Sequence, residues 1–237
     1  MSWLPAIRRG TRPAASGMAL AATTLAAGLA SATPPLRDQP RAGAFLYATP
    51  DLTGSLFGNT VVLLVQHDGS GSLGLIVNKP TDMALAEVLD IDGVEELQTP
   101  LYFGGPVGID GLTGLFRAER PPDEGKRVIG DVFFTTARGA LETALTAADA
   151  DSRVRIYAGY SGWGPGQLQG EIDRGSWVVT PAKPDHVFLD DPSELWEDIY
   201  LLLNRIEASL QEAVGHSLAS EARSGADVPG GQGRVAK

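Results

Sequence analysis

The residues best suited to chemistry lie in one stretch, Tyr160–Ile172, where a serine is followed by glycines that alternate with other residues. Glycine admits backbone angles closed to other residues and lets a ligand or another backbone approach closely. The apolar run Val154–Ala158 leads into the stretch, and Pro165 suits the first position of a helix, where no amide donor is needed. The pattern predicts a strand, a tight glycine-rich turn and a short helix. The residues of this turn that can contact a ligand are Ser161, Gly162, Trp163, Gly164 and Gly166.

Ser161 is a candidate nucleophile, because its surroundings approach the glycine-x-serine-x-glycine elbow of serine hydrolases. The elbow needs glycine two residues after the serine, where this chain has Trp163. The histidines available as a general base are His67, His186 and His216. The last of these lies in a small, polar stretch that we expect to be a tail. These observations argue against a serine hydrolase.

Phosphate or nucleotide binding is the second chemistry that the glycines suggest. Their spacing is not that of a dinucleotide-binding turn, Pro165 removes one amide, and the chain has no Gly-Lys-Ser/Thr sequence. A glycine-rich turn at a helix start can still hold an anion, although a packing role for the glycines is favoured. Two further turns would line the same pocket if they lie nearby in space. Their candidate residues are Asn78, Lys79, Gly104 and Gly105.

Metal and cofactor sites are not predicted. The chain has no cysteine, which excludes disulfides, thiolate ligands and a cysteine nucleophile. Histidine stands beside carboxylates at His67-Asp68, and His186 precedes Asp190 and Asp191, but neither group has a recognised ligand spacing.

The elements that must position these residues form a mixed α+β pattern. Runs of apolar and β-branched residues predict strands over residues 44–48, 60–67, 72–78, 100–107, 111–116, 128–135, 153–160, 176–180 and 186–189. Apolar residues at helical spacing predict helices over residues 82–89, 138–148 and from 191 to 206. The last begins at Asp191-Pro-Ser-Glu194, a good start signal. We expect one domain over residues 41–212.

The two ends differ from this domain. Residues 1–40 contain three arginines near their start, Arg8, Arg9 and Arg12. A weakly apolar run follows and ends near Ala32. This stretch fits a disordered extension, a start codon upstream of a true start at Met18 or later, a transit peptide, or a signal cleaved near Ala32. It is too short and too weakly apolar for a stable membrane span. Residues 213–237 are small and polar, which predicts a disordered tail.

Net charge limits the possible partners. The chain carries −10 at pH 7, and the basic N-terminal residues make the rest more acidic still. Such a surface repels the phosphate backbone that supplies most non-specific affinity for nucleic acids. Direct DNA binding is therefore disfavoured.

Several motifs, taken in order, resemble the AlgH/YqgE family. They span most of the chain from about residue 43 to about residue 203, and their combination is specific. The motifs are Phe45-Leu-Tyr-Ala-Thr-Pro50, the strand Val61–His67, Gly74-Leu-Ile-Val-Asn-Lys-Pro80, Phe103-Gly-Gly-Pro-Val107 and Tyr157-Ala-Gly-Tyr-Ser-Gly-Trp-Gly-Pro-Gly-Gln-Leu168. The chain departs from common family forms at Arg117, where many members have histidine, and in its N-terminal extension.

The resemblance implies a single α/β domain in which a bifurcated mixed β-sheet curls into a pseudo-barrel with flanking helices. It implies a cytoplasmic bacterial protein, with export as the alternative if residues 1–32 are cleaved. No enzymatic activity is agreed for the family, and one branch is labelled a transcriptional regulator. We expect a non-enzymatic regulatory or adaptor protein that acts through protein partners. A small-molecule, nucleotide or anion binder using the glycine-rich turns is the alternative, and a transcriptional regulator is the third reading.

Overall fold

The computed structural model describes residues 38–120, 124–147 and 153–225, with side chains described up to residue 217. The predicted N-terminal extension, with its cleavage near Ala32, lies almost wholly outside these residues, and so does the end of the chain from residue 226.

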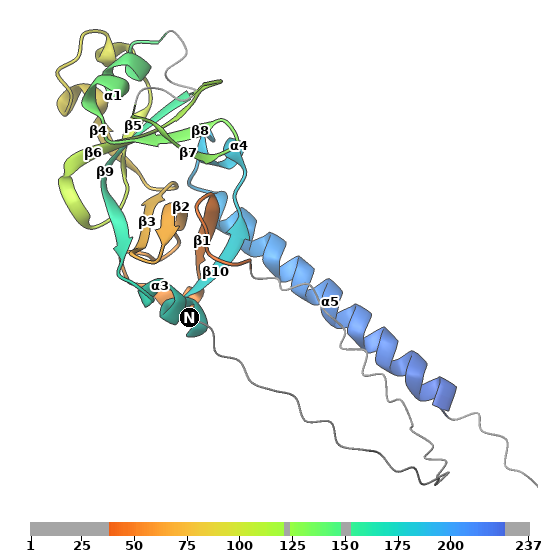
Figure 1. Ribbon diagram of the computed structural model, residues 1–237. Helices are drawn as coiled ribbons and strands as arrows, with labels where there is room; N and C mark the ends of the chain where they lie inside the picture. The colour runs from red at the N-terminus through yellow and green to blue at the C-terminus, as the bar shows by residue number, and fades with distance from the viewer. Residues whose placement is uncertain (1–37, 121–123, 148–152, 226–237) are drawn as a thin grey trace, which may run out of the picture. The chain divides into compact units, whose positions relative to one another are not determined.

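One ten-stranded sheet forms the body of the described chain (Figure 1). Its strands are β1 (Ala44–Ala48), β2 (Val61–Asp68), β3 (Gly71–Ile76), β4 (Pro80–Ala84), β5 (Pro100–Phe103), β6 (Val107–Arg117), β7 (Lys126–Ile129), β8 (Val132–Thr135), β9 (Val154–Trp163) and β10 (Trp177–Pro181). The strand order is β10-β1-β2-β3-β9-β6-β8-β7, with β5 added beside β9 and β4 beside β5.

The sheet divides at β9, which has three partner strands. Its first half pairs antiparallel with β6 and, over Ile156–Ala158, parallel with β5. Its last residues, Ser161–Trp163, pair antiparallel with β3. All other strand pairs are antiparallel. The predicted bifurcated mixed sheet is therefore confirmed.

The sheet also curls, so that β7 returns to the start of β1. A Cβ atom on Gly43 would lie 2.7 Å from the carbonyl oxygen of Val128 in β7. Gly43 has a φ of +78°, so glycine suits this contact both for its conformation and for its lack of a side chain. The curled sheet is the predicted pseudo-barrel.

The core occupies both faces of the central strands. Phe45, Leu63 and Leu75 point into the curl, where they meet the start of the last helix. Their strand neighbours, such as Leu46 and Val62, face the opposite way and are equally buried. Burial on two faces explains the almost continuous apolar runs of β1, β2 and β3.

Helices flank the sheet. They are α1 (Arg138–Leu145), α3 (Gln167–Asp173), α4 (Pro184–Val187) and α5 (Leu195–Gly225), with single 3₁₀ turns at Pro50–Leu52, Leu85–Glu87 and Val94–Glu96. Helix α1 covers the β6–β9 region, and α3 covers the outer face of β1, β2 and β3. The first turns of α5 pack against β1, where the Trp196 indole donates a hydrogen bond to the Ala48 carbonyl at 2.8 Å.

Several predicted elements are wrong in type or extent. Residues 82–89, predicted as a helix, continue strand β4 to Ala84 and then make one 3₁₀ turn. The backbone amide of Phe103 donates to the Lys79 carbonyl, and the Thr81 hydroxyl donates to the Leu101 carbonyl. These contacts with β5 override the local helical spacing.

Residues 186–189, predicted as a strand, belong to the short helix α4 and the residues after it. Pro184 occupies the first turn of α4, where its fixed backbone angle favours a helix. The single strand predicted over 128–135 is a hairpin, because Gly130 adopts a φ of +53° between β7 and β8.

Helix α5 differs from its prediction at both ends. It begins at Leu195, while the Asp191 carboxylate caps a turn by accepting hydrogen bonds from Ser193. It continues to Gly225, so residues 213–225, predicted as a disordered tail, are helical. The three alanines, Leu218, Glu221 and Arg223 of this segment are good helix formers, and their preference outweighs the cost of its single internal glycine, Gly215.

Candidate functional site

The glycine-rich stretch lies where β9 crosses the turn between β5 and β6. A Cβ on Gly104 would lie 2.4 Å from the Gly159 carbonyl oxygen, and one on Gly105 would lie 2.5 Å from the Ser161 amide nitrogen. The two backbones therefore touch, and glycine is needed for that contact. Strand β9 continues without a break through Gly162 to Trp163, so the predicted turn begins only at Gly164.

Ser161 is fully buried in this crossing. Its hydroxyl donates a hydrogen bond to the Gly104 carbonyl at 3.1 Å, and the same carbonyl accepts the Ile76 amide. A nucleophile must reach its substrate, and this hydroxyl is enclosed between two strands. Ser161 therefore holds the crossing together in this structure.

Glu171 in α3 anchors the tryptophans on either side of it. Its Oε2 accepts the indole N–H of Trp163 at 2.9 Å and that of Trp177 at 2.8 Å, and its Oε1 accepts Gln167 Nε2 at 3.0 Å. Burial is the largest single influence on the Glu171 pKa and raises it. The hydrogen bonds from Trp177, Gln167 and Trp163 together outweigh burial and lower the pKa below its usual value.

The start of α3 is closed by its own side chains. Gly166 caps the helix with a φ of +73°, so Pro165 lies before the helix rather than at its predicted first position. The Gly164 amide donates to Gln167 Oε1 at 3.1 Å. This amide, one of those expected to hold an anion, thus bonds a side chain, and α3 is only seven residues long.

Asn78 and Lys79 brace the neighbouring loop. Asn78 Oδ1 accepts the Val61 amide at 2.8 Å, and its Nδ2 donates to the Asn59 carbonyl at 3.0 Å. Lys79 Nζ donates to the Leu56 carbonyl at 2.6 Å, and partial burial lowers the pKa of this ammonium. Both side chains therefore support the chain between β1 and β2.

The predicted site residues do not line one pocket. Gly104, Gly105 and Ser161 meet inside the crossing, whereas Gly162 and Trp163 border a separate shallow groove of about 380 Å³. This groove also contains Ser72, whose hydroxyl lies 2.8 Å from His67 Nδ1. Within the described part of the chain, no group of three His, Cys, Asp or Glu side chains could hold a metal ion.

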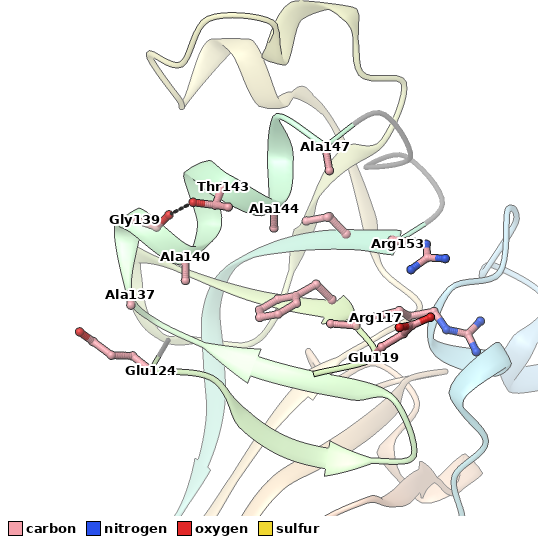
Figure 2. A pocket seen from close by; sticks show the side chains of 13 residues that line it. Arg117, Glu119, Glu124, Ala137, Gly139, Ala140, Thr143, Ala144, Ala147 and Arg153 are labelled. Carbon is pink, nitrogen blue, oxygen red and sulfur yellow. Dashed lines mark hydrogen bonds between the residues drawn. The ribbon is translucent and has the colours of Figure 1, made fainter. Parts of the chain in front are cut away.

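A larger pocket, which the sequence did not predict, lies beside α1 (Figure 2). Its volume is about 790 Å³, within the range of small-molecule sites. Phe116 and Val154 form its apolar floor, and small residues in and directly beside α1 form one wall. Those small residues are Ala137, Gly139, Ala140, Ala144 and Ala147. Their helical spacing in the sequence was the one signal that could have indicated this wall.

Charged side chains gather at one end of the α1 pocket. Figure 2 shows Arg117, Glu119 and Arg153 together there, away from Glu124. Arg117 donates to Asp131 at 2.9 Å and to Asp185 at 3.0 Å. The hydrogen bond from Arg117 lowers the pKa of the Asp131 carboxyl. Because acidic partners surround this arginine, the end of the pocket is not strongly cationic.

Helix α5 carries an exposed apolar face. Leu195 and Ile199 are buried against the sheet, whereas from residue 204 to 217 no side chain is buried by the described residues. Leu202 is 50% exposed and Ile206 is 37% exposed, and the two lie one helical turn apart on the same side of α5. Figure 1 shows no labelled element beside these later turns. None of the helices within the described ranges is both long and apolar enough to cross a lipid bilayer.

Comparison with known proteins supports the resemblance. The sequence model of the AlgH-like family matches residues 45–206. A UPF0301 protein of Streptomyces coelicolor is 36% identical over 165 residues, covering 66% of this chain and 83% of the relative. A UPF0301 protein of Idiomarina loihiensis is 34% identical over 181 residues, covering 73% of this chain and 96% of the relative.

Two solved structures are similar in fold. The crystal structure of protein DIP2367 from Corynebacterium diphtheriae has a TM-score of 0.58 at 26% identity, covering 69% of this chain and 87% of that one. The solution structure of AlgH from Pseudomonas aeruginosa has a TM-score of 0.55 at 26% identity, covering 84% of this chain and 100% of that one. The motifs, the divided and curled sheet and these matches together show that the chain belongs to the AlgH-like family.

Proposed function

We propose that this chain is a non-enzymatic regulatory or adaptor protein, and that it binds protein partners through the exposed apolar face of α5. The observation that carries the proposal is the pair of large apolar side chains at Leu202 and Ile206, one helical turn apart, which the described residues leave partly exposed. Contiguous exposed apolar surface on a folded protein is typical of a site that binds a partner.

The internal roles of the box residues support this proposal. The Ser161 hydroxyl is enclosed, the Glu171 carboxylate bonds two indoles, and the Asn78 amide bonds two backbone groups. Side chains engaged in this way stabilise the domain and are poorly placed for acid, base or nucleophilic work. The glycine-rich box then serves to build the domain that presents α5.

Affinity capture from the native cell at physiological salt tests the proposal. The wild-type chain should recover a protein that Ile206→Glu does not, because the new carboxylate would lie in the apolar contact. Gln211→Glu is the matched control, since it adds the same charge on the opposite side of α5 and should leave capture unchanged. Equal recovery by all three forms would remove α5 from the binding surface.

A second candidate function, small-molecule binding, is favoured by the α1 pocket with its apolar floor and charged end. A ligand at a hundred times its dissociation constant adds about 2.7 kcal/mol of stability, which a thermal-shift screen detects. Ala140→Trp, which would fill the pocket, should abolish such a shift. A flat screen against nucleotides, carboxylates and phosphates would count against this candidate.

A further inference from the structure

We propose that the α5 face pairs with the same face of a second copy of this chain, with the two helices antiparallel. This inference rests on the proposed function, because it names the partner of that surface. The family match ends at residue 206, whereas α5 continues to Gly225. The remaining 19 residues span about 28 Å at 1.5 Å per residue, and most of the stability of helices in proteins comes from packing rather than from propensity.

Two large apolar residues and two small ones, all exposed, repeat along α5 with the spacing of a helix-pairing seam. Leu202, Ile206, Ser209 and Ala213 follow one another at alternate intervals of four, three and four residues, which keeps them on one side of α5. Leu203 and Leu210 lie next to this seam and are partly buried. Leu203 packs against the core of its own domain, so the uncovered seam is the one centred on Ile206.

Two opposite charges lie on one flank of the seam. Arg205 and Glu212 are seven residues apart, which places them about 10 Å apart along the helix axis, too far to bond within one helix. The Arg205 Nε donates only to the Leu201 carbonyl of its own helix, and neither side chain has an ion pair among the described residues.

Antiparallel pairing of two identical helices uses these charges. In that arrangement the same flank of each helix faces the other, so Arg205 of each copy meets Glu212 of the other. In the register that sets Arg205 level with Glu212 of the other copy, Leu202 is level with Gly215 and lies within two residues, about 3 Å along the helix axis, of Ala213. Parallel pairing in register would instead place Arg205 beside Leu210 and leave both charges without partners. Charge complementarity therefore favours a second copy in the antiparallel direction.

The two-fold axis of this register passes between Ala208 and Ser209. Leu203, the last residue of α5 that packs against its own domain, lies about 8 Å from the axis along the helix. The central layers of the pair thus lie beyond the domain surface. A contact of about 14 residues per helix is small, so association should be weak and depend on concentration.

Sedimentation velocity of the full chain, over a series from low to high micromolar concentration, tests the pairing. The wild type should shift from monomer toward dimer. Arg205→Glu or Glu212→Arg alone should weaken association about tenfold, because each turns two attractions into repulsions. The double variant Arg205→Glu/Glu212→Arg should restore it. Circular dichroism of each variant checks that α5 is intact.

A wild type that stays monomeric throughout would overturn the pairing, and so would a dimer that ignores both single reversals. Failure of the double variant to restore association would overturn the antiparallel register. These outcomes are separate from those of the proposed function. A monomeric chain that still captures another protein through Ile206 keeps the function and loses only the self-pairing.

Discussion

Replacing Glu171 with alanine should strongly destabilise the domain. The substitution removes the acceptor of two indole N–H groups at 2.8 and 2.9 Å and of the Gln167 amide at 3.0 Å. A hydrogen bond to a charged group contributes about 1.5–3 kcal/mol. Glu171 is only partly buried, so water offsets part of this loss. We expect Glu171→Ala to lower the free energy of unfolding by about 2–4 kcal/mol.

Urea unfolding followed by far-ultraviolet circular dichroism measures this loss without relying on the affected tryptophans. For a domain of this size the same loss lowers Tm by roughly 5–15 °C. Asp173→Asn is the matched control, because Asp173 lies on the same helix and bonds only the exposed Gln169 side chain. It should change stability by less than about 0.5 kcal/mol. If Glu171→Ala and Asp173→Asn unfold at the same urea concentration, the anchoring role of Glu171 is wrong.

The remaining predictions concern pH, the backbone crossing and the interior of the curl. The pKa of Glu171 is lowered in the folded state, so its ionised carboxylate contributes fully to the free energy of unfolding above about pH 4.3, and this contribution is lost as pH falls through the lower folded pKa. Glu171→Gln should remove that part of the loss of stability in acid, measured by urea titrations over a pH series. Gly105→Ala should lower the free energy of unfolding by at least about 3 kcal/mol or prevent folding, because the new Cβ would overlap the backbone of β9 at a φ of +147°. Gly139→Ala is the control: no other atom lies near this position, so the substitution should leave stability unchanged or raise it. Thermal melts distinguish the two variants. Tyr157→Phe should stabilise the protein by up to about 1 kcal/mol in urea unfolding, since the buried Tyr157 hydroxyl has no hydrogen-bond partner among the described residues, and a loss instead would show that this hydroxyl is satisfied.

The sequence predicted the fold best where burial on two faces left a strong pattern. Strands β1, β2 and β3 were placed within about two residues because their apolar runs reflect two buried faces. The division of the sheet at β9 came from the family resemblance, since no local pattern shows that one strand has three partners.

Errors arose where distant contacts outweighed local preference. Asp82 and the apolar residues after it look helical in isolation, yet pairing with β5 holds this segment extended as far as Ala84. The opposite error concerns α5, for which helical spacing was predicted only to residue 206 and a disordered tail from residue 213. Its seam at Leu202, Ile206, Ser209 and Ala213 was visible as spacing, but the polar composition after Gly215 outweighed it.

The candidate site was predicted only in part. The glycine-rich box was identified as a structural unit, and the close approach at Gly105 agrees with that interpretation. Glu171 was missed because its role depends on Trp163 and Trp177, which come together only when α3 packs on the sheet. The α1 pocket was missed for the same reason, since its floor and wall come from separate elements.

Photocrosslinking in the native cell, with a photoreactive amino acid at position 206 of α5, tests most directly whether this face of the helix binds a protein. We expect a covalent adduct with a protein from position 206 and none from position 211, on the opposite side of the helix. A second copy of this chain in that adduct would match the antiparallel pairing. Absence of any adduct at 206, or equal adducts at both positions, would contradict the claim that this face of α5 is the binding surface.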